Sequence, residues 1–197
     1  MIKHFVIFPS PDIGLTAYTI GALVDGGLSP THPKIQSGLE YILPTNVSVL
    51  ESLDSYSLWW VANTLTLVDV NHPRLQGILD LLESRRRGDS GMRFWSDSAV
   101  GVKAVTSGDI ETTAYALMTS AKLGKIDESV DMTRWLTQQR NGKGFLSTQD
   151  TVCGLQALAR ISEILYSRTG KFHVKFESVN ETKEFNLNQV RRVGVVN

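Results

Sequence analysis

Four aspartates begin similar phrases along the chain, and their carboxylates are the groups best suited to chemistry. They are Asp12, Asp54, Asp109 and Asp150. General acid–base catalysis would need two of these carboxylates to converge on one pocket, and nothing in their spacing shows this. A carboxylate at the start of a helix accepts the free backbone N–H groups of the first turn. We therefore expect the four aspartates to be helix N-caps.

The single cysteine, Cys153, is the candidate for thiol or metal chemistry. It lies in the phrase Thr-Val-Cys-Gly-Leu, which is typical of a buried helix, and we predict a packed core thiol. Asp150 lies three residues before it, as in some zinc sites, but the later His173 falls in a predicted strand. We predict structural or surface roles for the histidines His4, His32, His72 and His173. The sequence thus predicts no catalytic residue, cofactor site or metal ligand.

Composition and short motifs indicate which partners and which cellular compartments suit the protein. The chain has 20 basic and 20 acidic residues, so charge gives it no attraction to nucleic acid. The apolar run from Phe5 to Phe8 is too short for a signal peptide, and no stretch could span a bilayer, so we expect neither a signal peptide nor membrane insertion. Asn46-Val47-Ser48 and Asn180-Glu181-Thr182 are candidate N-glycosylation sites at Asn46 and Asn180 if the chain is secreted.

The elements that carry the aspartates form a helical repeat. The four phrases start 42, 55 and 41 residues apart, which fits one helical hairpin per unit. The segments that follow are apolar on nearly all sides, which predicts helices that are buried on most sides. These inner helices are expected at residues 12–25, 54–68, 109–123 and 150–166. Between them lie segments with a single apolar stripe, such as Leu75, Ile78, Leu79 and Leu82, which predict three half-exposed outer helices.

Alternating inner and outer helices predict an all-α fold, an α/α toroid or solenoid. Four inner and three outer helices make three and a half hairpins, whereas a closed ring would need more. After Gly170 apolar residues alternate with polar ones at every second position, which predicts a short β-hairpin that pairs with strands elsewhere. We expect two domains, with residues 1–168 as an incomplete helical ring and 169–197 as a β-strand segment.

Several phrases resemble the thioester-containing domain of the α2-macroglobulin and complement superfamily. The longest runs from Arg134 to Leu158, and Leu15-Thr-Ala-Tyr18 and Asp109–Leu117 also match. Gly91-Met-Arg-Phe-Trp95 is most similar to the CD109-like and insect thioester-protein branch. Residues 171–190 resemble strands of the CUB domain into which the thioester domain is inserted. The matches are collinear over nearly the whole chain.

The resemblance implies a toroid within a large extracellular or cell-surface protein that traps proteases, opsonises targets or regulates receptors. In this superfamily the chemistry comes from a bond between the Cys and Gln side chains of a Gly-Cys-Gly-Glu-Gln motif, which this sequence lacks. We therefore expect a non-enzymatic fragment of such a protein, without cofactors. Its partners would be proteases or cell-surface targets, through the parent molecule, and the remaining domains of that parent.

Two alternatives stay open at the level of sequence. Gly142-Lys-Gly-Phe145 followed by a buried helix is similar to the repeats of prenyltransferase and terpene cyclase toroids. Those enzymes need an Asp-rich motif or a zinc site, so stoichiometric zinc would favour them. The other alternative is a helical-repeat binding module without thioester ancestry. An incomplete ring would expose apolar faces of its inner helices, whereas a closed module would not.

Overall fold

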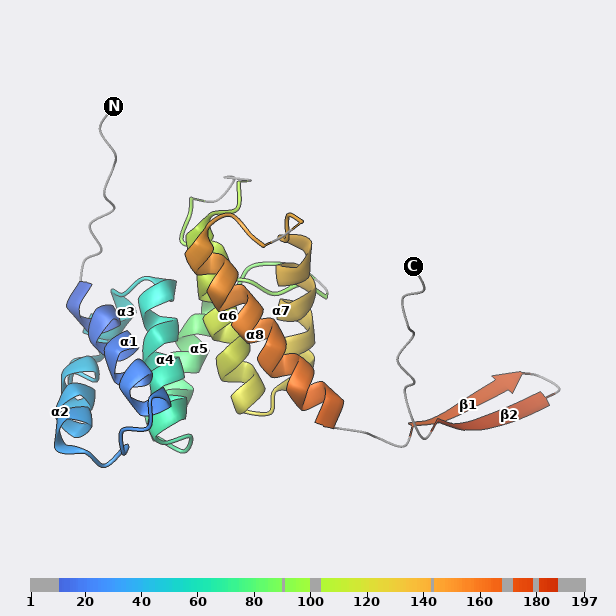
Figure 1. The fold of residues 1–197 in the computed structure, drawn as a ribbon, viewed down its shortest axis with the longest axis horizontal. Coiled ribbons are helices and arrows are strands. Elements are labelled where there is room, and N and C mark those ends of the chain that lie inside the picture. The colour runs from blue at the N-terminus through green and yellow to red at the C-terminus, as the bar shows by residue number, and fades with distance from the viewer. Residues whose placement is uncertain are drawn as a thin grey trace. The chain divides into compact units, whose positions relative to one another are not determined.

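The computed structural model describes residues 11–89, 91–99, 104–142, 144–167, 172–178 and 181–187 (Figure 1). The chain divides into two units, Met1–Ile161 and Ser162–Asn197, and each is described by itself. The described residues are mostly helical, which confirms the all-α prediction.

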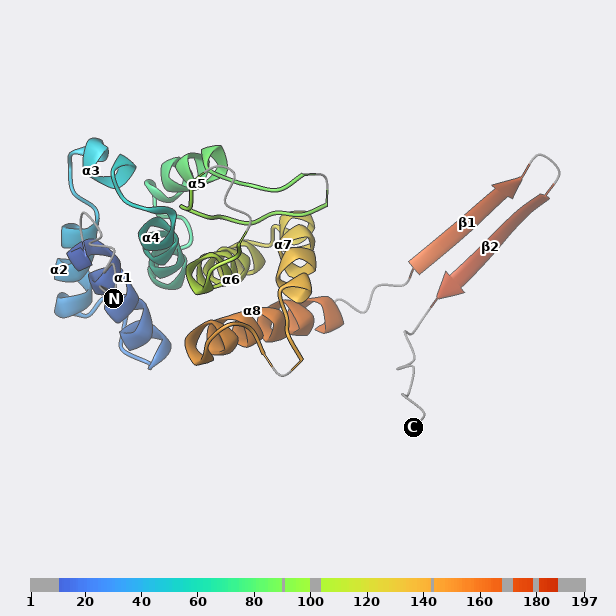
Figure 2. The same ribbon diagram turned by 90° about the horizontal axis from the view of Figure 1, so that it is seen from above.

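The first unit alternates inner and outer helices. The inner helices are α1 (Pro11–Asp25), α4 (Ser55–Val68), α6 (Ser107–Lys122) and α8 (Thr148–Ser167). The outer helices are α2 (Pro33–Ile42), α5 (Leu75–Ser84) and α7 (Ile126–Gln138). Helix α1 packs on α2 and α4, and α6 packs on α4 and α7 (Figure 2). Each predicted helix is present, and a short helix that we did not predict, α3 (Val47–Glu51), lies between α2 and α4.

Two glycines allow close packing between α1 and α4. A Cβ at Gly14 would lie 2.7 Å from the Oγ of Ser57, and one at Gly21 would lie 3.2 Å from the Oγ1 of Thr64. The Thr64 hydroxyl donates a 2.6 Å hydrogen bond to the backbone oxygen of Ala17. Larger residues at these two positions would force the helices apart, because packed interiors leave few voids.

The Gly91–Trp95 phrase joins three helices. The Trp95 indole is buried, donates a 2.7 Å hydrogen bond to the backbone oxygen of Leu82 on α5, and meets Trp59 of α4 edge-on at 4.9 Å. The neighbouring ring of Phe94 stacks on Trp135 of α7 at 4.7 Å. The phrase thus contributes to the core rather than to an exposed binding loop.

The repeated aspartates all lie at helix starts, but only one is an N-cap. The Asp54 carboxylate accepts a 2.6 Å hydrogen bond from the backbone N–H of Ser57. The prediction was wrong for Asp109 and Asp150, which lie three residues after the caps Thr106 and Ser147 and bond back to their backbone N–H groups. Such capping boxes satisfy two free donors at once. It was also wrong for Asp12, which lies inside the first turn of α1.

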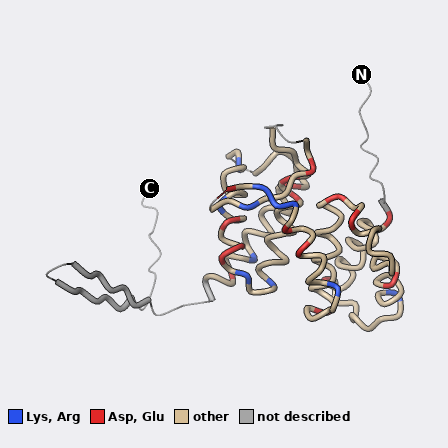
Figure 3. The backbone as a smooth tube through the Cα atoms, turned by 180° about the vertical axis from the view of Figure 1, so that it is seen from behind, with Lys and Arg blue, Asp and Glu red and all other residues tan. Residues whose placement is uncertain are grey.

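Charged groups stabilise the surface of this unit locally. In Figure 3 basic and acidic residues are interspersed along the helices. The guanidinium of Arg85, just after α5, donates to the backbone oxygens of Glu51 and Leu53 at 2.7 and 2.5 Å, which satisfies carbonyls at the end of α3. Arg93 pairs with Glu83 at 2.8 Å and with Glu128 at 3.3 Å. These contacts give the arginines structural roles.

The second unit contains two antiparallel strands, β1 (Phe172–Ser178) and β2 (Glu181–Leu187). Phe172 pairs with Leu187, and Ser178 pairs with Glu181. Asn180, one of the two glycosylation candidates, lies outside the described residues.

Burial differs between the middle and the ends of the helical series. The apolar side chains of α4 and α6 are largely buried, as predicted. The same expectation was wrong for α1 and α8, where Leu15 is 58% exposed and Val152 is 51% exposed. Tyr18, Leu23 and Leu155 are exposed as well. The end helices have an inner neighbour on one side only, so their other faces meet solvent.

Candidate functional site

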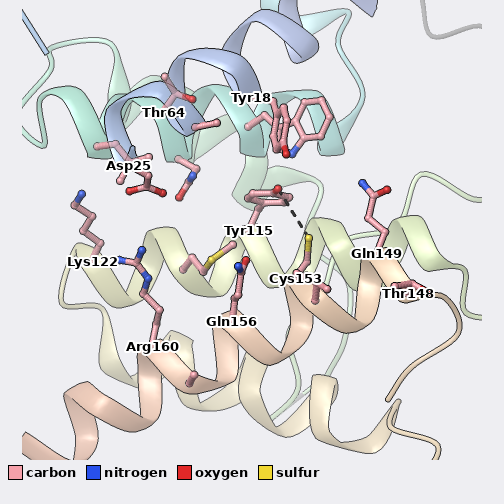
Figure 4. A pocket seen from close by; sticks show the side chains of 18 residues that line it. Tyr18, Asp25, Thr64, Tyr115, Lys122, Thr148, Gln149, Cys153, Gln156 and Arg160 are labelled. Carbon is pink, nitrogen blue, oxygen red and sulfur yellow. Dashed lines mark hydrogen bonds between the residues drawn. The ribbon is translucent and has the colours of Figure 1, made fainter. Parts of the chain in front are cut away.

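The four inner helices enclose an open cavity of about 890 Å³ (Figure 4), within the size range of ligand pockets. Helices α4 and α6 line its floor, and α1 and α8 line its sides. We call it the inner groove. Its lining comprises Tyr18, Gly21, Ala22, Asp25, Trp60, Asn63, Thr64, Leu67, Tyr115, Met118, Lys122, Thr148, Gln149, Val152, Cys153, Gln156, Ala159 and Arg160.

Aromatic rings occupy one part of this groove. Trp60 of α4 contacts Tyr18 of α1 at 5.1 Å and Tyr115 of α6 at 6.0 Å between ring centroids. On the same helix Tyr56 lies 4.4 Å from Trp60. Aromatic contacts of this kind stabilise packing beyond the area they bury. The aromatic cluster thus packs three inner helices, α1, α4 and α6, against one another.

A buried carboxylate beside these rings connects three helices. Glu111 of α6 is 8% exposed, and it accepts a 2.5 Å hydrogen bond from the Tyr56 hydroxyl of α4. The side-chain amide of Gln149 on α8 donates to the same oxygen at 3.3 Å. Burial raises the pKa of Glu111, the Tyr56 and Gln149 hydrogen bonds lower it, and the nearby Asp150 charge raises it. Burial, followed by this hydrogen bond, also raises the pKa of Tyr56 far above its usual range.

Charged side chains line the other part of the groove. Lys122 of α6, Arg160 of α8 and Asp25 of α1 gather there (Figure 4). Burial lowers the pKa of Lys122, while the Asp25 carboxylate raises it and the Arg160 guanidinium lowers it. One carboxylate therefore faces two cations in this part of the groove.

Cys153 is buried, as predicted, and its thiol faces the inner groove. The Sγ atom donates to the Tyr115 hydroxyl at 3.9 Å. Burial raises the pKa of this thiol, while the Tyr115 hydrogen bond lowers it. The protonated thiol favoured by the raised pKa is a weak nucleophile.

Gln156 lies three residues after Cys153 and also lines the groove. Cys153 and Gln156 therefore have the same spacing in the sequence as the reactive pair of the thioester motif. The flanking Val152 and Leu155 differ from that motif.

The other candidates have structural positions. The Nδ1 atoms of His32 and His72 each accept a 3.2 Å hydrogen bond from the backbone N–H two residues later, at the starts of two outer helices. His4 and the side chain of His173 lie outside the described residues. Within the described ranges no group of three or more His, Cys, Asp or Glu residues could hold a metal ion.

The sequence patterns did not predict Glu111 and its partners. Glu111 is the one charged residue between Ile110 and Ala121, and a lone charge in an apolar helix is a signal that could have found it. Its partner Tyr56 lies 55 residues away, so the pairing has no local signal. Asp25, Lys122 and Arg160 look like ordinary surface charges in the sequence.

The polar groups of this site are engaged in contacts between helices. Its carboxylate is engaged by hydrogen-bond donors, and its thiol has a raised pKa. The fold and the groove together define a helical-repeat scaffold with an open inner face.

Comparison with known proteins assigns this scaffold to a family. The model of the A-macroglobulin TED domain matches residues 10–161, so the chain belongs to this family. This confirms the resemblance drawn from the sequence. The chain is 29% identical over 179 residues to Thioester-containing protein 1 allele R1 of Anopheles gambiae, covering 89% of the chain and 12% of that protein.

Two further relatives come from vertebrates. Complement C3 of Lethenteron camtschaticum is 31% identical over 134 residues, which cover 66% of the chain and 8% of that protein. Ovostatin of Gallus gallus is 30% identical over 198 residues, covering 92% of the chain and 13% of that protein. The chain thus spans about an eighth or less of the length of these relatives. Among the described helices, none combines the length and the hydropathy that a membrane-spanning segment requires.

Proposed function

We propose that the chain is a non-enzymatic scaffold segment of a larger extracellular or cell-surface protein of the A-macroglobulin and complement family. The match over residues 10–161 is the observation that carries this proposal. The parent would trap proteases, opsonise targets or regulate a surface receptor, and its protein partners would be reached through the whole molecule. The strands after residue 168 would belong to a separate, CUB-like domain.

We further propose that the inner helices are part of an α/α toroid. The support is that, among the four inner helices, only the end helices α1 and α8 expose large apolar side chains within the described residues, and Leu15 on α1 and Val152 on α8 are both more than half exposed. Monomeric proteins rarely leave contiguous apolar faces in water. Further helices that pack on α1 and α8 would cover these faces and close the ring. The groove charges Lys122, Arg160 and Asp25 would then face those helices.

The scaffold proposal also holds that this segment forms no thioester. The chain lacks the Gly-Cys-Gly-Glu-Gln motif, and its one cysteine is held in helix α8 against Tyr115. Asp150, which a zinc-dependent toroid enzyme would need as a ligand, accepts the backbone N–H of Ser147 at 2.8 Å. This contact gives Asp150 a structural role as the acid of the capping box of α8.

Cysteine labelling tests the toroid proposal. Val152→Cys and the buried control Ala157→Cys are each made in a Cys153→Ser background, both in this chain and in the larger protein that the scaffold proposal requires. We expect a maleimide to label Val152→Cys rapidly in this chain and at least tenfold more slowly in that larger protein. The control should react slowly in both. Equal rates for Val152→Cys in the two proteins would contradict ring closure over this face.

A further inference from the structure

We propose that Asn46 is an N-glycan acceptor whose side chain also caps helix α3. The inference rests on the extracellular location proposed above. In the reaction, the Nδ2 atom of asparagine bonds to C1 of an oligosaccharide carried on a lipid diphosphate. The C1–O bond to the diphosphate breaks, the lipid diphosphate leaves with both bonding electrons, and Nδ2 loses one proton. Asn46-Val47-Ser48 has the required Asn-x-Ser pattern, with valine rather than proline at the middle position.

The acceptor segment is accessible to an enzyme. Asn46, Val47 and Ser48 are all exposed, and 56% of the Val47 surface meets solvent. An exposed valine at the start of a helix contributes nothing to the core. A glycan on the preceding residue would shield this apolar side chain from water.

The two polar atoms of the Asn46 side chain have separate roles. Its Oδ1 atom accepts a 3.1 Å hydrogen bond from the backbone N–H of Ser48, which is the N-cap contact of α3. Its Nδ2 atom, which would carry the sugar, donates no hydrogen bond within the described part of the chain. A glycosylated amide keeps its carbonyl oxygen, so the glycan and the cap are compatible.

The position of α3 keeps a glycan away from the inner groove. Leu50 and Leu53 anchor the end of this short helix in the core, and Arg85 bonds the carbonyls there. Asn46 lies at the opposite, exposed end. Figure 2 shows α3 on the far side of α4 from α8, whereas the groove lies between α1 and α8. Glycosylation at Asn46 would therefore leave the groove open to packing partners.

Secretory expression of the full chain tests the inference. A cleavable secretion signal is fused to the chain, and Asn180→Gln is made in every variant so that only the Asn46 sequon remains. Asn46→Asp removes the acceptor amide and keeps an N-cap oxygen, because aspartate caps helices as well as asparagine does. Ser48→Ala breaks the sequon and keeps both Asn46 and the backbone donor. Protein is recovered from medium and from cell membranes, and masses are measured before and after peptide N-glycosidase.

We expect the Asn180→Gln chain to carry a glycan that the glycosidase removes, leaving aspartate at position 46. Both Asn46→Asp and Ser48→Ala should lack it. An unmodified Asn46 peptide as the only form in both fractions would overturn the acceptor role. Because the fusion supplies export, that result would leave the proposed scaffold function untouched.

The capping role is tested on unglycosylated protein from bacteria. Asn46→Ala removes the N-cap oxygen, so it should lower the thermal midpoint by about 2–4 °C for a chain of this size. Asn46→Asp should leave it nearly unchanged. An equal fall for both variants would show that Asn46 does not act through its capping oxygen.

Discussion

The hydrogen bond between Tyr56 and Glu111 should make the stability of this fold depend on pH in a defined way. We predict that Tyr56→Phe destabilises the chain more at pH 7 than at pH 4. The substitution removes the hydroxyl that donates to Glu111 at 2.5 Å and keeps the ring that contacts Trp60 at 4.4 Å. The lost interaction is therefore the hydrogen bond alone.

The magnitude follows from the charge state of Glu111. A hydrogen bond to a charged group contributes roughly 1.5–3 kcal/mol, and a neutral one roughly 0.5–1.5 kcal/mol. Burial raises the pKa of Glu111, so the fraction of protonated carboxyl grows as the pH falls from 7 to 4. We expect Tyr56→Phe to cost about 2 kcal/mol at pH 7 and about 1 kcal/mol at pH 4.

The sign follows from proton linkage. A carboxyl whose pKa is raised on folding binds its proton more tightly in the folded state. The stability that Glu111 contributes is thus fully present below its unfolded pKa and lost as pH rises through the folded pKa. The Tyr56 hydrogen bond lowers the pKa of Glu111 in the folded state. Removing this bond therefore makes the loss of folding stability with rising pH larger and extends that loss to higher pH.

Urea unfolding followed by tryptophan fluorescence, at both pH values, measures the difference. The free energy of unfolding comes from linear extrapolation, provided that the slopes agree between variants. Glu111→Gln is the matched control, because in this background Tyr56→Phe should cost the same at both pH values. A cost of Tyr56→Phe in the wild-type background that is equal at both pH values, or greater at pH 4, would refute the charge-assisted hydrogen bond.

Three further substitutions test the packing. Gly14→Val should destabilise the chain by about 1–3 kcal/mol, because a Cβ there meets Ser57, and unchanged urea stability would contradict the close helix contact. Gly77→Ala in α5, where a Cβ meets no atom within 4 Å, should stabilise by about 0.5–1 kcal/mol in the same assay. Trp95→Ala should cost about 3–5 kcal/mol in thermal unfolding, because the 1% exposed indole also bonds to Leu82, and a loss below 1 kcal/mol would refute its core role.

Apolar periodicity predicted the long helices because each buries a continuous face. The stripe Leu75, Ile78, Leu79 and Leu82 is buried in α5, as expected. Helix α3 escaped prediction because five residues are too few for a helical period to show. The Thr106–Asp109 capping box had a local signal, a hydroxyl residue three positions before an acid, which would have identified the true cap.

The candidate site was less predictable, because it depends on contacts between distant segments. The buried state of Cys153 followed from its apolar neighbours on one helix. The groove requires that Tyr18, Trp60 and Tyr115 come together from three helices, and a pattern within one helix cannot show this. The exposure of α1 and α8 depends on which helices neighbour them.

The central claim is that the chain keeps the scaffold of a TED domain without its acylating bond. Cys153 and Gln156 have the spacing of the reactive pair, so intact mass and thiol titration of the native chain with labelled methylamine test the claim directly. Thioester-containing protein 1 serves as the reactive control. We predict that titration in denaturant finds one free thiol per chain, both before and after treatment with methylamine. The intact mass should be that of an unmodified chain, and the chain should take up no labelled methylamine. The claim would be contradicted by a native chain whose mass is lower by one ammonia and that has no free thiol. Such a chain would gain one free thiol when it takes up one molecule of methylamine.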